Sequence, residues 1–457
     1  MRITKWKIII LSLIPLGTEM LWGLYNSYVP IYLQSGSAGI NSTSGFLGFG
    51  LTPFFAGIIL SFSNVFSIFV NPYFGSLSDN TLSRIGRRKP YILTFVPLLA
   101  LSFVLIPIIP SFIIKESNGI ISKMPGLFIM FVAACTIICL IWSALGNIVV
   151  AMRWDVIDTG LRSKAQGFVV FITYIGMIFI MLVGPLLYKI SPVLPFSLVS
   201  GELVLALLLV MLFHKEPYEY KIKGNETKKL IIFNQSISDS GINKEGNRIG
   251  GIINSFLTIK SLPIKNRTAL IRVVLAIVFN AAALSILKVF LTSYIVFSLH
   301  EQPGFATQLS GIFYLMVLIT AIPTGIISTK IGKQKSVIVG FLMMASVLWI
   351  AFVFTNTYIF IGILIFVGLF MNLVNINLVL LSVDCAENDL LVASFLSIGS
   401  IASTFGSFIG PILSGFIIQI FSKEYRIIFL LITIFYLLGA ASLTMINKKK
   451  PKISLAE

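Results

Sequence analysis

Long apolar segments, separated by short polar gaps, recur along the whole chain of 457 residues. Each is about one bilayer thickness long, since a helix of about 20 apolar residues crosses the hydrocarbon core. Runs such as 98–109 and 203–213 carry no charged residue at all. The pattern predicts an all-α membrane protein with twelve transmembrane helices, near residues 7–33, 50–74, 91–114, 125–151, 165–188, 194–213, 268–298, 305–328, 336–354, 357–381, 390–421 and 425–446.

One longer polar stretch, 214–265, is rich in Lys, Asn, Ser and Gly and interrupts the series after the sixth segment. Such a composition is typical of a flexible linker. We therefore expect four parts along the chain: a first six-helix half over 1–213, a cytoplasmic linker over 214–265, a second six-helix half over 266–447 and a cytoplasmic tail over 448–457.

The two predicted halves repeat short motifs at equivalent loops. An aspartate followed by an apolar segment that contains Gly-Pro occurs in both, at Asp155 and at Asp384, and the loop motif that starts at Gly75 recurs in weaker form from Gly325. A duplicated six-helix unit is the common plan of transporters that rock two halves about a site at the membrane midplane. The repeat therefore favours transport over a simple membrane anchor.

The composition also indicates that lipid is the main solvent of this chain. Of the residues, 57% are hydrophobic and 11% are charged, and the mean hydropathy is +0.97, whereas soluble domains carry charge on about a quarter of their residues. The net charge of +17 does not predict nucleic-acid binding, because most of the 34 Lys and Arg gather at the N-terminus, in alternate loops, in 214–265 and in the tail. Since basic loops stay on the cytoplasmic side, we expect both termini in the cytoplasm of a multi-pass cell-membrane protein. Three cysteines and two histidines indicate neither a disulfide framework nor a metal site, and no cofactor is expected.

The loop between the second and third segments carries the most specific motif. It reads Gly75-Ser-Leu-Ser-Asp79, then four residues, then Arg84-Ile-Gly86-Arg87-Arg88-Lys-Pro. A basic, glycine-punctuated cytoplasmic turn suits two tightly packed helices, and Gly75 is expected to allow their close approach. The stretch resembles the signature of the major facilitator superfamily, in the longer version found in proton-coupled sucrose transporters and their glycoside-porter relatives.

Two further stretches are similar to the same branch of that superfamily. Gly17-Thr-Glu19 with Trp22 and Pro30 looks like its first-helix pattern, and Asp155 followed by Arg162-Ser-Lys-Ala-Gln-Gly looks like its loop after helix four. The resemblance implies a major facilitator fold with two six-helix halves. It also implies a cytoplasmic gate that pairs while the inner side is closed, made of Gly75, Asp79, Arg84, Gly86, Arg87, Arg88, Asp155 and Arg162. Lys89 in place of a third arginine and a seventh helix poor in aromatic residues depart from the pattern.

Glu19 is the strongest candidate for a coupling site. It lies about 18 Å into the first segment at 1.5 Å per residue, where an ionised carboxylate is costly. Trp22 and Asn26 follow at helical spacing on the same face, so this face should line a cavity. A carboxylate there can load and release a proton, or it can stay protonated and bonded to a neighbour. Glu202, also within the membrane, lies on a helix that is peripheral in the resembled fold.

Other polar residues at membrane depth form the candidate substrate site. In the resembled fold, helices one, four, seven and ten line the cavity, and all four carry amides, hydroxyls or aromatic rings: Trp22, Tyr25, Asn26, Ser143, Asn147, Asn280, Asn372 and Asn375. Any of these side chains can instead form a hydrogen bond between two helices. Amides exchange hydrogen bonds with hydroxyls and rings offer flat apolar faces, so the lining fits a neutral polyhydroxyl solute. We expect Lys288 close to the outer surface, where its side chain can snorkel, with a role in substrate binding as the alternative.

The sequence thus favours a monomeric secondary transporter that imports a sugar or glycoside together with a coupling cation. A proton is favoured over sodium as that cation. An exporter of drugs or other amphiphiles is the nearest alternative. A non-transporting sensor on a transporter scaffold and a lipid-linked membrane enzyme are alternatives from other classes.

Overall fold

The computed structural model describes residues 5–36, 48–79, 81, 83, 85–113, 125–157, 162–214, 264–383 and 392–445. These residues form thirteen α-helices and the turns between them. The helices are α1 (Lys5–Gln34), α2 (Pro53–Leu60), α3 (Phe62–Asp79), α4 (Lys89–Ser111), α5 (Pro125–Val156), α6 (Arg162–Ile190), α7 (Leu194–Phe213), α10 (Ile264–Phe297), α11 (Pro303–Ile331), α12 (Lys333–Val353), α13 (Thr357–Val383), α14 (Val392–Ile420) and α15 (Ile427–Thr444). Twelve spans within them are long and apolar enough to cross a membrane. The prediction of an all-α protein with twelve membrane crossings is confirmed.

The second crossing consists of two helices, where the sequence predicts one. Ser61 separates α2 from α3, and its hydroxyl donates to Gly57 O at 2.8 Å and contacts Phe408 O of α14 at 3.2 Å. A serine hydroxyl that bonds a helix carbonyl competes with the regular backbone ladder and loosens the helix there. The two helices together form one candidate span, Pro53–Gly75, so the number of crossings is unchanged.

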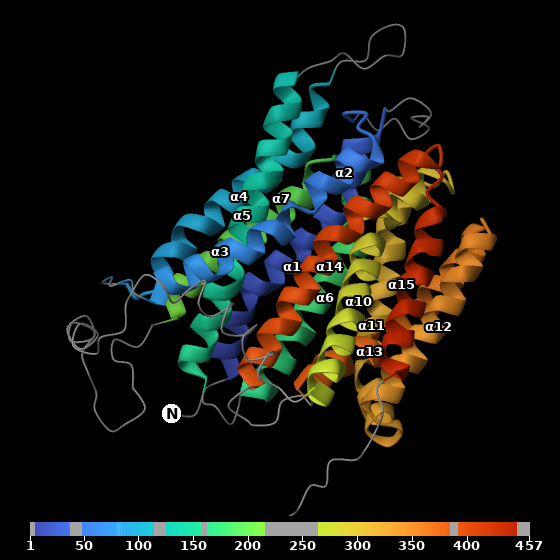
Figure 1. The fold of residues 1–457 in the computed structure, drawn as a ribbon. Helices are drawn as coiled ribbons and strands as arrows, with labels where there is room; N and C mark the ends of the chain where they lie inside the picture. The colour runs from blue at the N-terminus through green and yellow to red at the C-terminus, as the bar shows by residue number, and fades with distance from the viewer. Residues whose placement is uncertain are drawn as a thin grey trace, which may run out of the picture.

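The helices form one bundle with early and late segments on opposite sides. Figure 1 shows α3, α4 and α5 on one flank and α12, α13 and α15 on the other, with α1, α6, α10, α11 and α14 between them. Contacts between early and late helices are made by α6 with α11, α2 with α14, and α1 with α10. We call the end where α1 begins and α15 ends the terminal end, and the end where α1 finishes at Gln34 the distal end.

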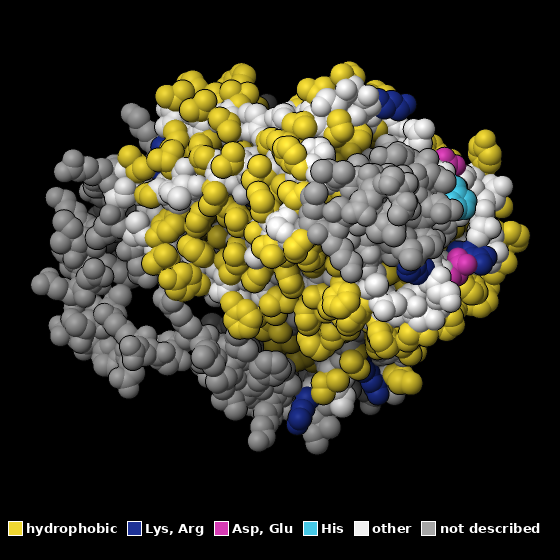
Figure 2. All heavy atoms as spheres, turned by 90° about the horizontal axis from the view of Figure 1, so that it is seen from above, with side chains coloured by type: hydrophobic (Ala, Val, Ile, Leu, Met, Phe, Trp, Pro, Cys, Tyr) yellow, Lys and Arg dark blue, Asp and Glu magenta, His cyan; other side chains and the backbone are white. Residues whose placement is uncertain are grey.

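The bundle exposes hydrophobic side chains on its outside. Large apolar residues of several helices are more than half exposed, among them Phe69, Leu101 and Leu205. Seen from above the view of Figure 1, hydrophobic side chains cover most of the described surface, and charged ones are few (Figure 2). Apolar patches of this extent are not stable in water, and they fit a surface surrounded by lipid. The 214–265 linker expected from the sequence lies almost wholly outside the described residues.

Four glycines bring α14 into backbone contact with two other helices. Any Cβ at Gly406 or Gly410 would collide with the backbone of α10, at Val278 O and Ala282 O respectively. Any Cβ at Gly415 would collide with Pro53 O of α2, and one at Gly57 of α2 with Pro411 O of α14. Small residues at helix interfaces allow this close packing in membranes, where no hydrophobic force drives helices together. We call these four residues the glycine seam.

The glycine seam makes Gly410→Ala a sensitive test of the packing. The new Cβ would lie 2.6 Å from Ala282 O and 2.5 Å from Ser285 Oγ, so α14 must move away from α10. We expect the unfolding free energy to fall by about 1–3 kcal/mol, measured as a lower midpoint of thermal unfolding in detergent. Gly362→Ala is the matched control, because a Cβ at Gly362 meets nothing within 4 Å and alanine favours a helix. Equal midpoints for the two variants would contradict the tight contact.

Candidate functional site

A polar cavity of about 590 Å³ lies inside the bundle, between helices from both ends of the chain. Its walls come from α1, α2, α3, α5, α10, α13 and α14. The lining residues are Trp22, Asn26, Leu60, Ser63, Asn64, Trp142, Ile277, Asn280, Ala281, Leu284, Ser285, Lys288, Val289, Asn375, Leu378, Gly399, Ser400, Ser403, Thr404 and Ser407. Cavities lined in part by converging polar groups are the usual ligand sites of proteins.

One wall of the cavity is aromatic. Trp22 of α1 and Trp142 of α5 stack with ring centroids 4.8 Å apart and planes 12° from parallel. Behind Trp22, Tyr25 stacks at 5.0 Å, but its ring is buried and its hydroxyl lies 3.6 Å from Cys139 Sγ. Tyr25 therefore supports the aromatic wall and does not line the cavity.

The predicted amides divide between the cavity and the interior of the bundle. Asn280 Nδ2 donates to Asn375 Oδ1 at 3.3 Å, and both residues line the cavity. Asn372, one turn away on α13, faces α11 and donates to Val317 O at 2.5 Å and to Thr320 Oγ1 at 3.1 Å. It joins two helices.

Two predicted residues of α5 lie outside the cavity lining. Ser143 is buried and shares a hydrogen bond of 3.1 Å with Ser67 Oγ of α3. Asn147, one turn further along α5, is exposed and is not among the lining residues. Of α5, Trp142 is the residue that reaches the cavity.

A row of hydroxyls on α14 completes the cavity and was missed from the sequence. Ser400, Ser403, Thr404 and Ser407 all line it. Their spacing of three and four places them on one face of the helix. This spacing is visible in the sequence and could have identified the face. Asn64 of α3 also lines the cavity and donates to Ser407 O at 3.1 Å.

Lys288 of α10 is a lining residue of this cavity. It is exposed there, and with Asn26 and Leu284 it also lines a smaller adjoining cavity. The expectation that Lys288 lies close to the outer surface is wrong, because the face of α10 that carries it turns toward α1. A Coulombic interaction connects Lys288 with Glu19 of α1, although no ion pair within 4 Å joins these two described residues.

The two acidic groups within the membrane have different surroundings. Glu19 is half-buried and interacts electrostatically with Tyr174 of α6 and Tyr314 of α11 as well as with Lys288. Glu202 of α7 fills the space left by Gly17, since its Oε2 occupies the place of a Cβ there. Neither Glu19 nor Glu202 is among the lining residues of the cavity.

Hydrogen bonds close the cavity toward the distal end. Gln34, at the end of α1, donates to Ser293 Oγ of α10 at 3.0 Å and accepts from Tyr425 Oη at 2.5 Å. Ser61 and Asn64 contact backbone oxygens of α14 at 3.2 and 3.1 Å. Together with the glycine seam, these contacts join early and late helices on the distal side of the cavity.

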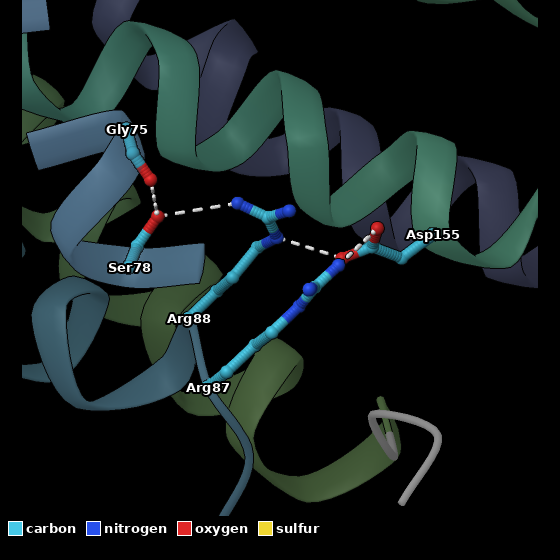
Figure 3. Close-up of polar contacts among 5 residues, drawn as sticks. All are labelled: Gly75, Ser78, Arg87, Arg88 and Asp155. Atoms are coloured by element: carbon cyan, nitrogen blue, oxygen red, sulfur yellow. Dashed lines mark hydrogen bonds and ion pairs between the residues drawn. The ribbon is translucent and has the colours of Figure 1, made fainter. Parts of the chain in front are cut away.

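At the terminal end, the loop between α3 and α4 is clamped to α5 (Figure 3). Arg87 Nη2 donates to Asp155 Oδ1 and Arg88 Nε donates to Asp155 Oδ2, both at 2.7 Å. Arg88 Nη1 also donates to Ser78 Oγ at 3.2 Å, and Ser78 donates to Gly75 O at 2.8 Å. Two guanidinium groups on one carboxylate form strong, charge-assisted bonds. We call this group the arginine clamp.

Two family models match the chain, one in each part. The model described as "MFS/sugar transport protein" matches residues 11–231, and the model described as "Major Facilitator Superfamily" matches residues 273–456. The chain belongs to the major facilitator superfamily. It is accordingly a membrane transporter, with the multi-pass location that the sequence predicts.

Solved structures of this superfamily share the fold of the transporter. A D-xylose-proton symporter is 14% identical with a TM-score of 0.64, over 96% of this chain and 98% of the other. The nucleoside transporter NupG is 12% identical with a TM-score of 0.64, over 96% and 100%. A bacterial homologue of the human lysosomal transporter Spinster, in an inward-facing and unoccupied conformation, is 13% identical with a TM-score of 0.69, over 96% and 95%. No curated protein gives a significant match.

In this transporter, the glycines of the superfamily's loop motif have different structural roles. Gly86 has φ of 120°, a conformation that favours glycine, and Gly332, at the corresponding place before α12, has φ of 93°. The expected close approach at Gly75 is wrong, because a Cβ there would meet no described atom within 4 Å. Arg84 and the side chains of Asp79 and Arg162 lie outside the described residues, so their gate roles stay predictions.

The arginine clamp predicts a loss of stability in Asp155→Asn. The change removes the charge that Arg87 and Arg88 share and weakens a charge-assisted bond of the 4%-exposed Arg88. We expect the unfolding free energy to fall by about 1–3 kcal/mol, measured by thermal unfolding of the purified transporter in detergent.

The matched control is Glu424→Gln, in the turn between α14 and α15. Arg426 bonds Glu424 at 2.9 Å and lowers the pKa of that carboxyl, but the two side chains are 37% and 46% exposed. Its removal should change the unfolding free energy by less than about 0.5 kcal/mol. If Asp155→Asn unfolds at the same temperature as this control, the clamp contributes no stability.

Proposed function

We propose that this transporter carries a sugar or glycoside across the cell membrane by alternating access, with a proton that binds Glu19 as the coupling ion. The observation that carries the proposal is the polar cavity at membrane depth, with one aromatic wall and an amide and hydroxyl wall facing it. Helices from both ends of the chain enclose this cavity, and we propose that the monomer is the working unit.

The lining of the cavity suits a polyhydroxyl solute. Asn26, Asn64, Asn280 and Asn375 supply amides, and α14 supplies a row of hydroxyls. Each amide both donates and accepts, so it can pair with sugar hydroxyls of any orientation. The stacked rings of Trp22 and Trp142 present a flat apolar face to the C–H side of a sugar ring. The match to the "MFS/sugar transport protein" model over 11–231 supports this solute class.

The closed distal end supports alternating access. We propose that the terminal end faces the cytoplasm, because most of the Lys and Arg lie in its loops and termini. The described conformation is then closed to the outside. Transport requires the two proposed six-helix halves, 1–213 and 266–447, to rock so that the distal contacts open and the terminal end closes.

Glu19 is the proposed proton site because of its depth and its neighbours. It shares a helix face with Trp22 and Asn26, which line the cavity. A carboxylate at this depth is stable when it is protonated or balanced by a cation, and the two conditions can alternate during a cycle. The D-xylose-proton symporter shows that this fold supports proton coupling in another protein.

Glu19→Gln tests the coupling role. We expect the variant to lose accumulation of sugar against its gradient and to keep sugar exchange at equal concentrations, because the amide preserves the cavity but cannot carry a proton. Uptake and counterflow of radiolabelled sugars in proteoliposomes with a pH gradient measure both activities.

Glu202→Gln is the matched control, because it removes a second carboxyl from the same membrane without touching the cavity. It should keep accumulation within about twofold of the unmodified transporter, since a conservative change away from the solute has a small effect. Accumulation that persists in Glu19→Gln would remove Glu19 from the coupling mechanism. Active flux of hydrophobic cations with no sugar flux would favour an exporter of amphiphiles.

A further inference from the structure

Resting on the proposed function, we infer that Lys288 is the anion-binding residue of the cavity, so that the transported solute carries a carboxylate or phosphate beside its hydroxyls. This narrows the solute from a neutral sugar to an anionic one. The inference concerns one side chain that the sequence placed near the surface and the structure places in the cavity wall.

The position of Lys288 is that of a ligand-binding cation. Among the described residues that line the cavity, Lys288 is the one with a formal charge. Its side chain is exposed to the cavity, and within the described structure it has no ion pair within 4 Å. Ionised side chains are rare within membranes, and those that occur face cavities and usually mark solute or ion pathways. An ammonium that points into a polar cavity presents three donors to an entering anion.

The surroundings of Lys288 would accept a sugar ring together with its charged group. Asn26 and Lys288 both line the polar cavity and the smaller adjoining cavity. The aromatic wall begins one turn away from Asn26, at Trp22. A solute whose ring contacts the tryptophans can therefore place a charged substituent near Lys288 while amides bind its hydroxyls.

The charge balance of the cavity connects this anion to the proton. Glu19 does not line the cavity but lies within Coulombic reach of Lys288, so the cavity and its surroundings are together neutral when both side chains are ionised. The other titratable groups that act on Glu19 are Tyr174 of α6 and Tyr314 of α11, which are neutral hydroxyls at ordinary pH. Glu202 of α7 lies against α1 at Gly17, outside the cavity lining.

When an anion binds Lys288, the cavity holds one negative charge too many, and a proton on Glu19 restores neutrality. Uncompensated charge in a cavity surrounded by lipid is unfavourable. A carboxylate and a proton would therefore cross together, one of each, with no net charge moved, whereas a doubly charged phosphate would leave one negative charge uncompensated. The same step with a neutral sugar would move one positive charge.

The first test is binding by the purified transporter, followed by the fluorescence of its tryptophans. The probes are methyl glucoside, its 6-carboxylate (the methyl glucuronide) and its 6-phosphate, which share one ring and differ at one carbon. We expect at least one anionic probe to bind about tenfold or more tightly than the neutral one. The two anionic arms decide between carboxylate and phosphate.

Variants assign the preference to Lys288. Lys288→Gln should lose the tenfold preference and keep the weaker binding of methyl glucoside, and Lys288→Arg should keep much of the preference. The matched control is Lys189→Gln, which removes an exposed lysine from the last turn of α6. A Lys288→Gln protein that keeps the preference would falsify the assignment, and so would a control that loses it.

The second test is transport of the bound anion in proteoliposomes. A pH gradient should drive its accumulation, and for the singly charged carboxylate a membrane potential set with valinomycin and potassium should have no effect. Uptake that follows the potential would overturn the charge balance between Lys288 and Glu19. A transporter that binds and carries methyl glucoside as well as the anions overturns the anion inference and leaves the proposed sugar transport intact. One that binds none of the three probes overturns both.

Discussion

The glycine seam is the contact on which the architecture around the cavity depends. At Gly406 and Gly410 the backbone of α14 touches α10, and at Gly415 it touches α2. One helix, α14, therefore joins late helices to early ones on the distal side. The backbones approach so closely there that a residue with a Cβ would not fit. A lipid environment gives helices little reason to associate through apolar surface alone, so close backbone packing and a few polar bonds supply the attraction. The cavity lies beside this contact, and its distal closure follows from it.

The polar groups of the protein interior serve two different purposes. Asn372 and Ser143 satisfy their hydrogen bonds with neighbouring helices and fix the packing of α13 on α11 and of α5 on α3. Asn280 and Asn375 bond only weakly to each other, at 3.3 Å, and face open space. A pair of amides that is loosely satisfied can exchange its bond for one to a solute at small cost. The amides whose hydrogen bonds are made with neighbouring helices are therefore structural, and those with weaker hydrogen bonds are candidates for binding.

The sequence was sufficient to predict the crossings, because hydrophobic length decides them. It also predicted that Trp22 and Asn26 face a cavity, since both lie at helical spacing from Glu19. It did not separate Asn372 from Asn375, which depends on the rotation of α13 about its own axis, and that rotation is set by packing. It placed Lys288 close to the outer surface, but a lysine within a membrane can also be solvated by a cavity, and the position of a cavity depends on helix packing. The break at Ser61 and the glycine seam depend on backbone contacts with α14, which lie far away along the chain.

The division of α14 into two faces has a consequence for how such a protein can change. Its glycines, which touch backbone, constrain one side of the helix, while Ser400, Ser403 and Thr404 border open space on another. Substitutions among these hydroxyl residues alter the shape and bonding of the cavity without altering the helix contacts. Selection or protein engineering could therefore change the proposed solute site through a few positions on one helix and leave the packing of the bundle as it is.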